Sequence, residues 1–176
     1  RTDTERRLTT RPVVFEGERP SISGDRIVWK HSSGPPQIIL YDLTNNTERR
    51  IAGALSKWDP AISGDRIVWE GSSYEDGKSN HDIYLYDLRT DTEQRLTTNL
   101  RFQRTPAIDG DWIVWHEVTL SQVLWWENPV GYLVAYNLQT GTEQQLTSIG
   151  ATAFGNPQIS GNRVVWEDRR YDAVFD

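Results

Sequence analysis

Polar and apolar residues alternate with a period of two along most of the chain, and one alternating pattern occurs four times. Each copy starts with Pro-x-Ile, passes a polar turn and ends in an apolar run closed by tryptophan; the copies are Pro20–Trp29, Pro60–Trp69, Pro106–Trp115 and Pro157–Trp166. This period is typical of strands, and no window keeps the 3.6-residue period of a helix beyond one turn. A repeat of 40 to 51 residues built from short strands predicts a β-propeller, a ring of small sheets called blades.

A second pattern lies between these copies and completes four strands per repeat. It runs from a tyrosine to a glutamate seven residues later, as from Tyr86 to Glu93. The first pattern supplies strands A and B, which are joined by a tight turn where glycine accepts a positive φ. These turn glycines are Gly24, Gly64, Gly110 and Gly161. The second pattern supplies strands C and D. The sequence therefore predicts an all-β chain of about four four-stranded antiparallel blades, with approximate limits 11–51, 52–98, 99–147, and 148–176 together with 1–10.

The spacings between these patterns vary in only two of the four connections. Pro to Trp is always nine residues and Tyr to Glu is seven, whereas Trp to Tyr runs from 12 to 21 and Glu to the next Pro from 12 to 15. One side of the disc is therefore predicted to carry constant hairpins and the other to carry variable loops, as in scaffolds that present a binding surface. The predicted loop side comprises 30–37, 52–59, 70–81, 97–105, 116–131 and 147–156.

The two ends of the chain contain complementary parts of one blade. Residues 1–10 form an unpaired strand D in this interpretation, and the C-terminal residues supply strands A and B and the start of C. Pairing of the N-terminal strand with the C-terminal blade would close a ring of about four blades and hide its sheet edges. In the alternative, two chains complete each other's blades in an eight-bladed ring. The chain is thus expected to be a monomer or a strand-completing homodimer; a fragment of a longer array is the third interpretation.

Composition argues against several classes of partner and chemistry. The chain has a net charge of −6 and no basic stripe, which argues against binding to nucleic acid. It has no apolar run long enough to span a membrane. It contains no cysteine, which removes disulfides and thiolate metal ligands. We expect neither a cofactor nor a metal.

Two phrases of the repeat resemble the blades of TolB-like β-propellers, especially the repeats of archaeal and bacterial cell-surface proteins. One is Ile-Ser-Gly-Asp-Arg-Ile-Val-Trp-Glu at 62–70, and the other runs from Asp82-Ile-Tyr-Leu-Tyr-Asp-Leu to Leu-Thr at 96–97. The resemblance covers nearly the whole chain. It implies an extracytoplasmic location, whether extracellular, on the cell surface or periplasmic, and binding to other proteins. Members of this family usually have six to eight blades, so a chain with about four departs from the pattern.

The aromatic residues fall into two groups. Trp29, Trp69, Trp115 and Trp166 share one repeat position at the end of strand B and are predicted to pack between blades. Other aromatics leave the repeat and lie in predicted loops, where rigid rings anchor partner proteins or stack on sugars. These are Trp58, Tyr74, Trp125 and Trp126. Trp112 also leaves the repeat, but it follows the turn between strands A and B, at a position where the other blades have Arg. In the structural alternative, Trp125 and Trp126 fold the long loop back over the disc.

Charged residues follow the strand-B tryptophan in every repeat. Lys30, His31, Glu70, His116, Glu117, Glu167 and Asp168 either line the mouth of the central channel or pair with arginines nearby, such as Arg66, Arg169 and Arg170. Their mixed types and offsets do not form a metal motif. Segment 74–82 lacks the ligand spacing of a calcium loop and is interpreted as a solvated hairpin loop. His116 and Glu117 are a candidate acid–base pair with Arg104 as an anion clamp, as a lyase would require.

The favoured hypothesis is a non-catalytic module for protein–protein interaction or structural display on a cell-surface or envelope protein. The candidate binding-face residues are Trp58, Tyr74, Arg104, His116, Glu117, Trp125 and Trp126. One alternative is a carbohydrate-binding, lectin-like propeller, and a second is a propeller enzyme of the polysaccharide lyase or hydrolase type. We expect that the chain is not an enzyme, because its sequence lacks a nucleophile elbow, a phosphate loop and a zinc-protease motif.

Overall fold

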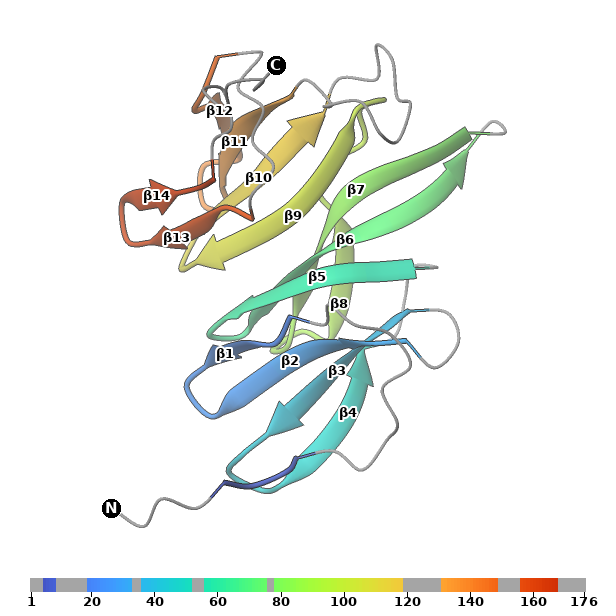
Figure 1. Ribbon diagram of the computed structural model, residues 1–176, viewed down its shortest axis with the longest axis vertical. Coiled ribbons are helices and arrows are strands. Elements are labelled where there is room, and N and C mark those ends of the chain that lie inside the picture. Colours follow the sequence, from blue (N-terminus) through green and yellow to red (C-terminus); the bar gives the residue numbers. More distant parts are fainter. Residues whose placement is uncertain are drawn as a thin grey trace, which may run out of the picture.

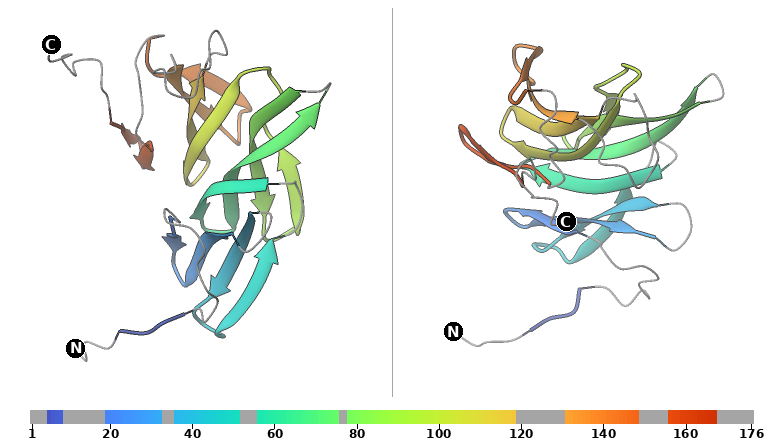
Figure 2. Two further views of the ribbon diagram at one scale, coloured as in Figure 1. Left: turned by 45° about the vertical axis from the view of Figure 1, so that its right-hand side comes forward. Right: turned by 45° about the horizontal axis from the view of Figure 1, so that its top comes forward.

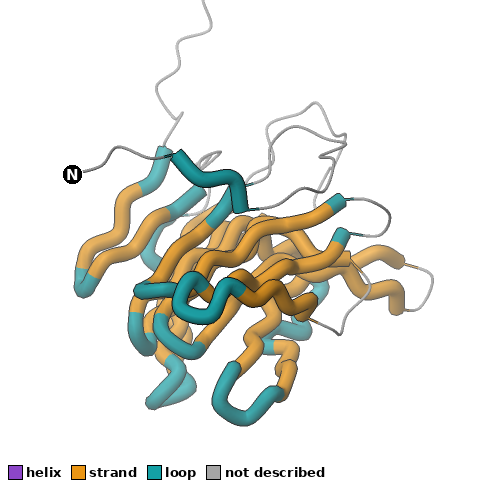
Figure 3. The backbone as a smooth tube through the Cα atoms, turned by 90° about the horizontal axis from the view of Figure 1, so that it is seen from below, coloured by secondary structure: helices purple, strands orange, loops and turns teal. Residues whose placement is uncertain are grey.

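A computed structural model describes residues 5–8, 19–32, 36–51, 56–75, 78–118, 131–148 and 156–167, the side chains of 73–75 and 78 excepted. This part of the chain forms strands and turns without any helix (Figure 3). The first sheet contains β1 (Ser21–Ser23), β2 (Arg26–His31), β3 (Gln37–Asp42) and β4 (Thr47–Ile51). The second contains β5 (Ser56–Ser63), β6 (Arg66–Glu75), β7 (Lys78–Asp87) and β8 (Thr92–Arg95). The third contains β9 (Phe102–Asp109), β10 (Trp112–Val118), β11 (Gly131–Asn137) and β12 (Thr142–Gln145), and β13 (Gln158–Ser160) pairs with β14 (Arg163–Val165).

Each sheet is an antiparallel meander in which strands follow chain order, and successive sheets pack face to face along an arc (Figures 1 and 2). These are the blades, numbered one to four in chain order, with β13 and β14 the described strands of the fourth. The prediction of an all-β fold built from four-stranded blades is confirmed. None of the described segments forms a helix long and apolar enough to cross a membrane.

The turns between strands A and B use glycine as the sequence predicts. Gly24, Gly64, Gly110 and Gly161 have φ between +56° and +57°, a region that side chains with a Cβ disfavour. The residues on either side of each turn pair across the hairpin, as Ser23 does with Arg26. These turns define the hairpin side of the molecule, and the opposite ends of the same strands define its loop side.

The apolar core lies between the blades and not within any one of them. Val28 of blade one packs with Ile62 and Trp69 of blade two, and Val68 of blade two packs with Trp115 of blade three. Trp69 and Trp115 are fully buried, as the inter-blade role predicts. Trp29 is half-buried and Trp166 is exposed; they stand on the first and last described blades. Trp69 also stacks on Tyr84 with ring centroids 5.9 Å apart.

The hairpin side joins neighbouring blades by contacts that repeat. Arg26 of blade one forms an ion pair with Asp65 of blade two and also donates to the Gly64 carbonyl at 3.3 Å. Arg66 of blade two does the same with Asp111 and the Gly110 carbonyl of blade three. A side-chain oxygen of each blade also accepts a hydrogen bond from the turn-glycine N–H of the next. These three bonds join Ser23 to Gly64 (2.9 Å), Ser63 to Gly110 (3.0 Å) and Asp109 to Gly161 (2.6 Å).

The N-terminal segment 5–8 lies against blade one. Arg6 donates to Tyr41 Oη at 2.7 Å and to Asn46 Oδ1 at 2.6 Å. Arg49 of β4 makes the equivalent contacts to the next blade, with Tyr86 Oη at 3.3 Å and Asp91 Oδ1 at 2.8 Å. The segment thus occupies the place of a strand D beside blade one. Within the described ranges it does not pair with β13 or β14, so closure of the ring stays a prediction.

Strands extend into segments that the sequence analysis assigned to loops. β6 and β7 have ten residues each and pair from Arg66–Asp87 as far as Glu75–Lys78. The interpretation of 74–82 as a solvated loop is wrong for Asn80 and Asp82, which lie in β7 and are buried. Polar side chains misled that interpretation, because Asp82 is neutralised by Arg95 at 2.9 Å and accepts from Thr97 at 3.3 Å.

Candidate functional site

A polar cavity of about 150 Å³ lies beside the strand-A prolines of the four blades, and we call it the axial mouth. The residue before the strand-A proline lines it in each blade; these residues are Arg19, Asp59, Thr105 and Asn156. The four positions carry four different side chains, although the proline after them is constant. The cavity is therefore a place where a repeated backbone presents residues that do not repeat.

Bulges aim two of these residues into the axial mouth. The β5–β6 pairing shifts register between Trp58 and Ala61, and the β9–β10 pairing shifts beside Thr105. Asp59 has φ of 47° and Thr105 has φ of 50°, both in the left-handed region. This conformation is strained for any residue with a Cβ and especially for a β-branched one, and such strain concentrates at functional sites. Bulges beside active or binding sites commonly re-aim a side chain in this way.

An aromatic stack spans the contact between blades two and three beside this cavity. The His81 ring stacks on Trp58, with centroids 5.4 Å apart and planes at 22°. Phe102 of blade three meets the same ring at 5.0 Å and 60°. Glu70 Oε1 lies 2.6 Å from His81 Nδ1, and Glu70 Oε2 accepts a hydrogen bond from the Thr105 N–H at 3.3 Å. Trp58 is half-buried, so part of its ring remains open to solvent.

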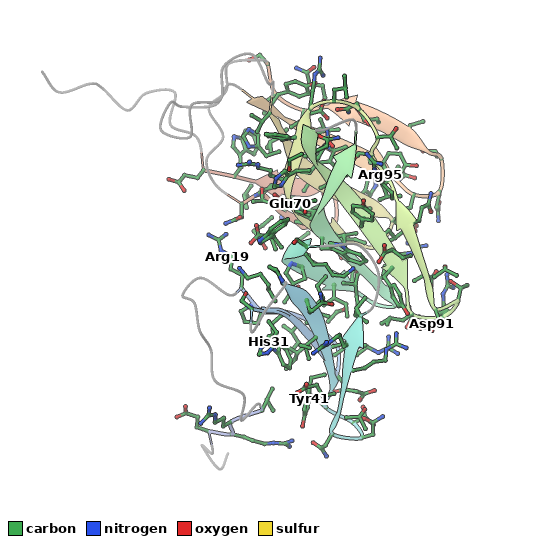
Figure 4. All side chains as sticks on the ribbon, turned by 90° about the vertical axis from the view of Figure 1, so that its right-hand side faces the viewer. Arg19, His31, Tyr41, Glu70, Asp91 and Arg95 are labelled. Atoms are coloured by element: carbon green, nitrogen blue, oxygen red, sulfur yellow. The ribbon has the colours of Figure 1, made fainter. Side chains whose placement is uncertain are left out.

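Charges of both signs surround Asp59. Burial raises the pKa of this carboxyl above its usual range, and the nearby Glu70 carboxylate raises it further. The positive charges of Arg19, Lys30 and Arg104 act in the opposite direction without cancelling the rise. Figure 4 shows Arg19 on the opposite side of the blades from Asp91, which marks the outer strands. Asp59 is therefore a strained, half-buried acid at the mouth, and three positive charges lie close enough to act on it.

Arg104 and His116 face each other across the β9–β10 ladder. Burial first, and then the positive charge of Arg104, lower the pKa of His116 from 6.5 to about 4, so the imidazole is neutral at pH 7. Its Nε2 has no hydrogen-bond partner among the residues that the structure describes. Gly131 lies directly against this ring, and a Cβ at that position would collide with it.

Glu117 points to the other face of blade three and does not join His116. Neighbouring residues of a strand project to opposite faces. Glu117 is buried and accepts hydrogen bonds from Arg101 Nη1 and Tyr132 Oη, each at 3.0 Å. The acid–base pair considered from the sequence is thus not assembled, because its members are separated by the sheet.

The remaining predicted residues divide between described and undescribed parts of the chain. Of the ring after the strand-B tryptophan, Lys30 and Glu70 lie near the axial mouth, while Arg66 pairs with Asp111 of the next turn. Trp112 begins β10 and is partly exposed on the hairpin side. Trp125, Trp126, Asp168, Arg169 and Arg170, together with the side chain of Tyr74, lie outside what the structure describes. No group of three His, Asp or Glu side chains in the described ranges is placed to hold a metal ion.

Sequence reasoning missed three parts of this region. His81 and Phe102 complete the aromatic stack; neither was singled out, and the one signal for Phe102 is that it is an aromatic residue shortly before a strand-A proline. Asp59 and Thr105 had one signal, their place before a constant proline. Lys57 was assigned to a loop, yet it is fully buried with Nζ 4.2 Å from the Trp69 ring centre and 3.1 Å from Glu93 Oε2. Burial lowers the pKa of Lys57, and Glu93 opposes that shift.

Comparison with known proteins supports the fold. No family model and no curated protein sequence matches the chain. The protein described as TolB from Agrobacterium tumefaciens is similar in structure, with a TM-score of 0.65 and 22% identity over 87% of this chain and 53% of that one. TolB from Acinetobacter baumannii gives 0.53 and 20%, over 85% and 39%. An oligogalacturonate lyase from Vibrio parahaemolyticus gives 0.56 and 15%, over 77% and 39%.

These likenesses establish a TolB-like β-propeller fold. The chain spans about half the length of the Agrobacterium protein and less of the other two. Identities this low carry the fold alone, and the named proteins differ in function, since one is a lyase.

Proposed function

We propose that this chain is a non-catalytic binding module that captures a segment of a partner protein at the axial mouth. The observation that carries the proposal is the pair of bulges that hold Asp59 and Thr105 at positive φ beside the half-open Trp58 ring. Strain of this kind persists only where the surrounding packing fixes it, and it is a common mark of binding sites. A polypeptide suits the mouth because it offers both charged groups and apolar side chains.

Rigid presentation would be the means of recognition. The blades fix the positions of Asp59, Arg104 and Trp58 before any partner arrives, because their strands are held by inter-blade packing. A preorganised surface loses little conformational entropy on binding. Arg19, Lys30 and Arg104 favour a partner segment with a carboxylate, while the open part of Trp58 offers an apolar anchor.

We further propose that the module works outside the cytoplasm, on an extracellular, cell-surface or periplasmic protein. Its TolB-like fold and the resemblance of its repeats to those of cell-surface proteins support this location. A non-enzymatic role is supported by the separation of His116 from Glu117 across the sheet. The neutral, buried state of His116 suits packing better than proton transfer at an open site.

Selection from a displayed library of random peptides, using the full 176-residue chain as bait, tests this proposal. We expect enriched peptides that contain acidic residues and bind through the mouth. Arg104→Gln and Trp58→Ala are expected to weaken their binding at least tenfold, while the matched change Arg66→Gln on the hairpin side leaves it unchanged. Melting temperatures measured alongside separate loss of binding from loss of fold.

A panel of oligosaccharides serves as the second arm of the test. Binding to a glycan without any enriched peptide would replace the proposal with a lectin-like function. Cleavage of an acidic oligosaccharide, abolished in His116→Ala with an intact fold, would replace it with a lyase. Absence of peptide, glycan and turnover signals would reject the axial mouth as a recognition site.

A further inference from the structure

The turn between β3 and β4 contains an acceptor sequence for N-linked sugars that occurs once in the chain. It consists of Asn45, Asn46 and Thr47, and no other asparagine has Ser or Thr two positions later. Such a sequence is modified where it lies on the surface of a protein outside the cytoplasm. Short motifs also occur by chance, so the geometry of the turn decides whether Asn45 can accept a sugar.

The Asn45 side chain uses its oxygen to hold the turn and leaves its nitrogen almost unused. Asn45 is exposed, as are Thr44, Asn46 and Thr47 around it. Its Oδ1 accepts two hydrogen bonds from Thr47, one from the N–H at 3.1 Å and one from Oγ1 at 2.5 Å. Within the described ranges its Nδ2 meets Asp42 Oδ2 at 3.5 Å, the outer limit of a hydrogen bond. The nitrogen that would bond to a sugar is therefore accessible and only weakly held.

The same turn in blades two and three forms without an asparagine at this position. Thr90 and Thr140 take its place, and the hydroxyl of each bonds to that of the threonine two residues later at 2.7 Å. Asn45 Oδ1 makes the equivalent bond to Thr47. The residue between the two partners has φ of 58° to 67° in all three turns. The fold therefore does not require the amide of Asn45, and what the asparagine adds is an exposed nitrogen.

The β3–β4 turn lies on the hairpin side, away from the axial mouth. The six residues of β3 separate it from the loop side by roughly 20 Å, at about 3.3 Å per residue. Asp91, which takes the place of Asn46 in blade two, lies across the blades from Arg19 of the mouth (Figure 4). A sugar chain on Asn45 would thus cover part of the hairpin side of blade one and leave the mouth open.

We propose that Asn45 is a site of N-glycosylation. The donor is an oligosaccharide joined to a lipid through phosphate or pyrophosphate, and a transferase catalyses the transfer. A bond forms between Asn45 Nδ2 and C1 of the first sugar, while the bond from C1 to the phosphate oxygen breaks and its electron pair leaves with the lipid phosphate. One amide proton passes to a base of the transferase, and nothing is oxidised or reduced. This inference rests on the proposed extracytoplasmic location and is independent of binding at the mouth.

Peptide mass mapping of the natural protein, purified from its own cells, tests the site itself. We expect the peptide that contains Asn45 to carry a sugar chain, with fragment spectra that place it on this residue. A bare Asn45 on protein recovered from the envelope or the medium would overturn the site and leave the proposed location intact. Recovery from the cytoplasm with a bare Asn45 would overturn both.

Variants of the full chain, secreted behind a cleavable leader by a eukaryotic cell line, test the geometry of the turn. We expect one glycan on the natural sequence, none in Thr47→Ala and none in Asn45→Thr, which restores the turn residue of the other blades. Thr140→Asn creates the acceptor sequence on the equivalent turn of blade three and should add a second glycan.

An unchanged melting temperature in Asn45→Thr, measured beside the enzymatically deglycosylated natural chain, would show that the variant loses the acceptor and not the fold. A secreted natural chain without a glycan would overturn the proposal. A glycan that persists in Asn45→Thr would do so as well, because the sugar would then be attached elsewhere.

Discussion

The two ends of each strand B behave differently, although they belong to the same repeat. On the hairpin side, Arg26 and Arg66 make the same ion pair and the same carbonyl contact from blade to blade. On the loop side, the residues four positions further along each strand differ from blade to blade. They are Lys30, Glu70 and His116, and they have no common partner. Repetition at one end joins the blades, and variation at the other creates a site. Departure from the repeat, and not conformity to it, therefore marks the candidate functional residues.

The largest effect is expected from the repeated core. Trp69→Ala removes a fully buried ring that stacks on Tyr84 and supports Lys57, and it should lower the free energy of unfolding by about 3–5 kcal/mol. Urea titration measures this loss. Trp58→Ala, outside the repeat and half-buried, is the matched change and should cost about 1 kcal/mol or less while impairing peptide binding. Equal losses in the two variants would erase the distinction between core and surface tryptophans.

Acid should destabilise the loop side through His116. Its pKa of about 4 in the fold lies below the ordinary 6.5, so the unfolded chain binds the proton more readily between these values. The free energy of unfolding should therefore fall as the pH drops from about 6.5 to about 4, by at most about 3 kcal/mol, and the contribution is constant above 6.5.

His116→Gln removes the titrating group, so the fall in stability over that pH range should shrink in this variant. Denaturant titrations of both chains at a series of pH values measure the difference. An unchanged pH profile would contradict the burial and neutral state of His116.

Relief of strain at the axial mouth should stabilise the fold. Thr105→Gly removes the Cβ that a φ of 50° disfavours, and we expect a gain of about 1 kcal/mol in the free energy of unfolding. Thermal unfolding measures the gain, and Thr105→Ala is the control that keeps a Cβ and should bring none. A loss of stability in the glycine variant would mean that the backbone there is not strained.

The smallest effect is expected from restoring the repeat on the hairpin side. Trp112→Arg together with Asn162→Asp rebuilds the ion pair that joins the other blades. A double-mutant cycle should show a coupling energy of about 0.5 kcal/mol, typical of partly exposed pairs. Zero coupling would mean that blades three and four meet in a different geometry from the first three.

Most of the fold could be predicted because the sequence repeats the pattern of one blade. The turn glycines, the strands around them and the burial of Trp69 and Trp115 follow from local propensity and from a position that recurs. Ring closure was also predicted and stays a prediction: segment 5–8 lies against blade one, and residues 168–176, which would supply strand C of the last blade, lie outside the described residues. Closure depends on contacts between remote faces, which no local pattern specifies.

Much less of the candidate site could be predicted. Trp58 was named as a binding-face candidate because off-register aromatics are visible in a repeat, and Arg104 was named as an anion clamp; their role in binding stays a prediction. The His81 and Phe102 contacts were not, since they depend on how two blades pack and on the extra length of β6 and β7. His116 and Glu117 are adjacent in sequence and separated in space, because a strand sends neighbours to opposite faces.

The most direct test is to compare amide hydrogen exchange of the chain with and without a selected peptide. It tests whether the loop side binds the partner while the hairpin side joins the blades. We expect slower exchange on binding at the loop-side backbone of 56–59, 80–83 and 102–106, with the turns at 63–66 and 109–112 unchanged. Protection concentrated at the hairpin-side turns would contradict a loop-side binding site, because the repeated contacts would then be the binding surface.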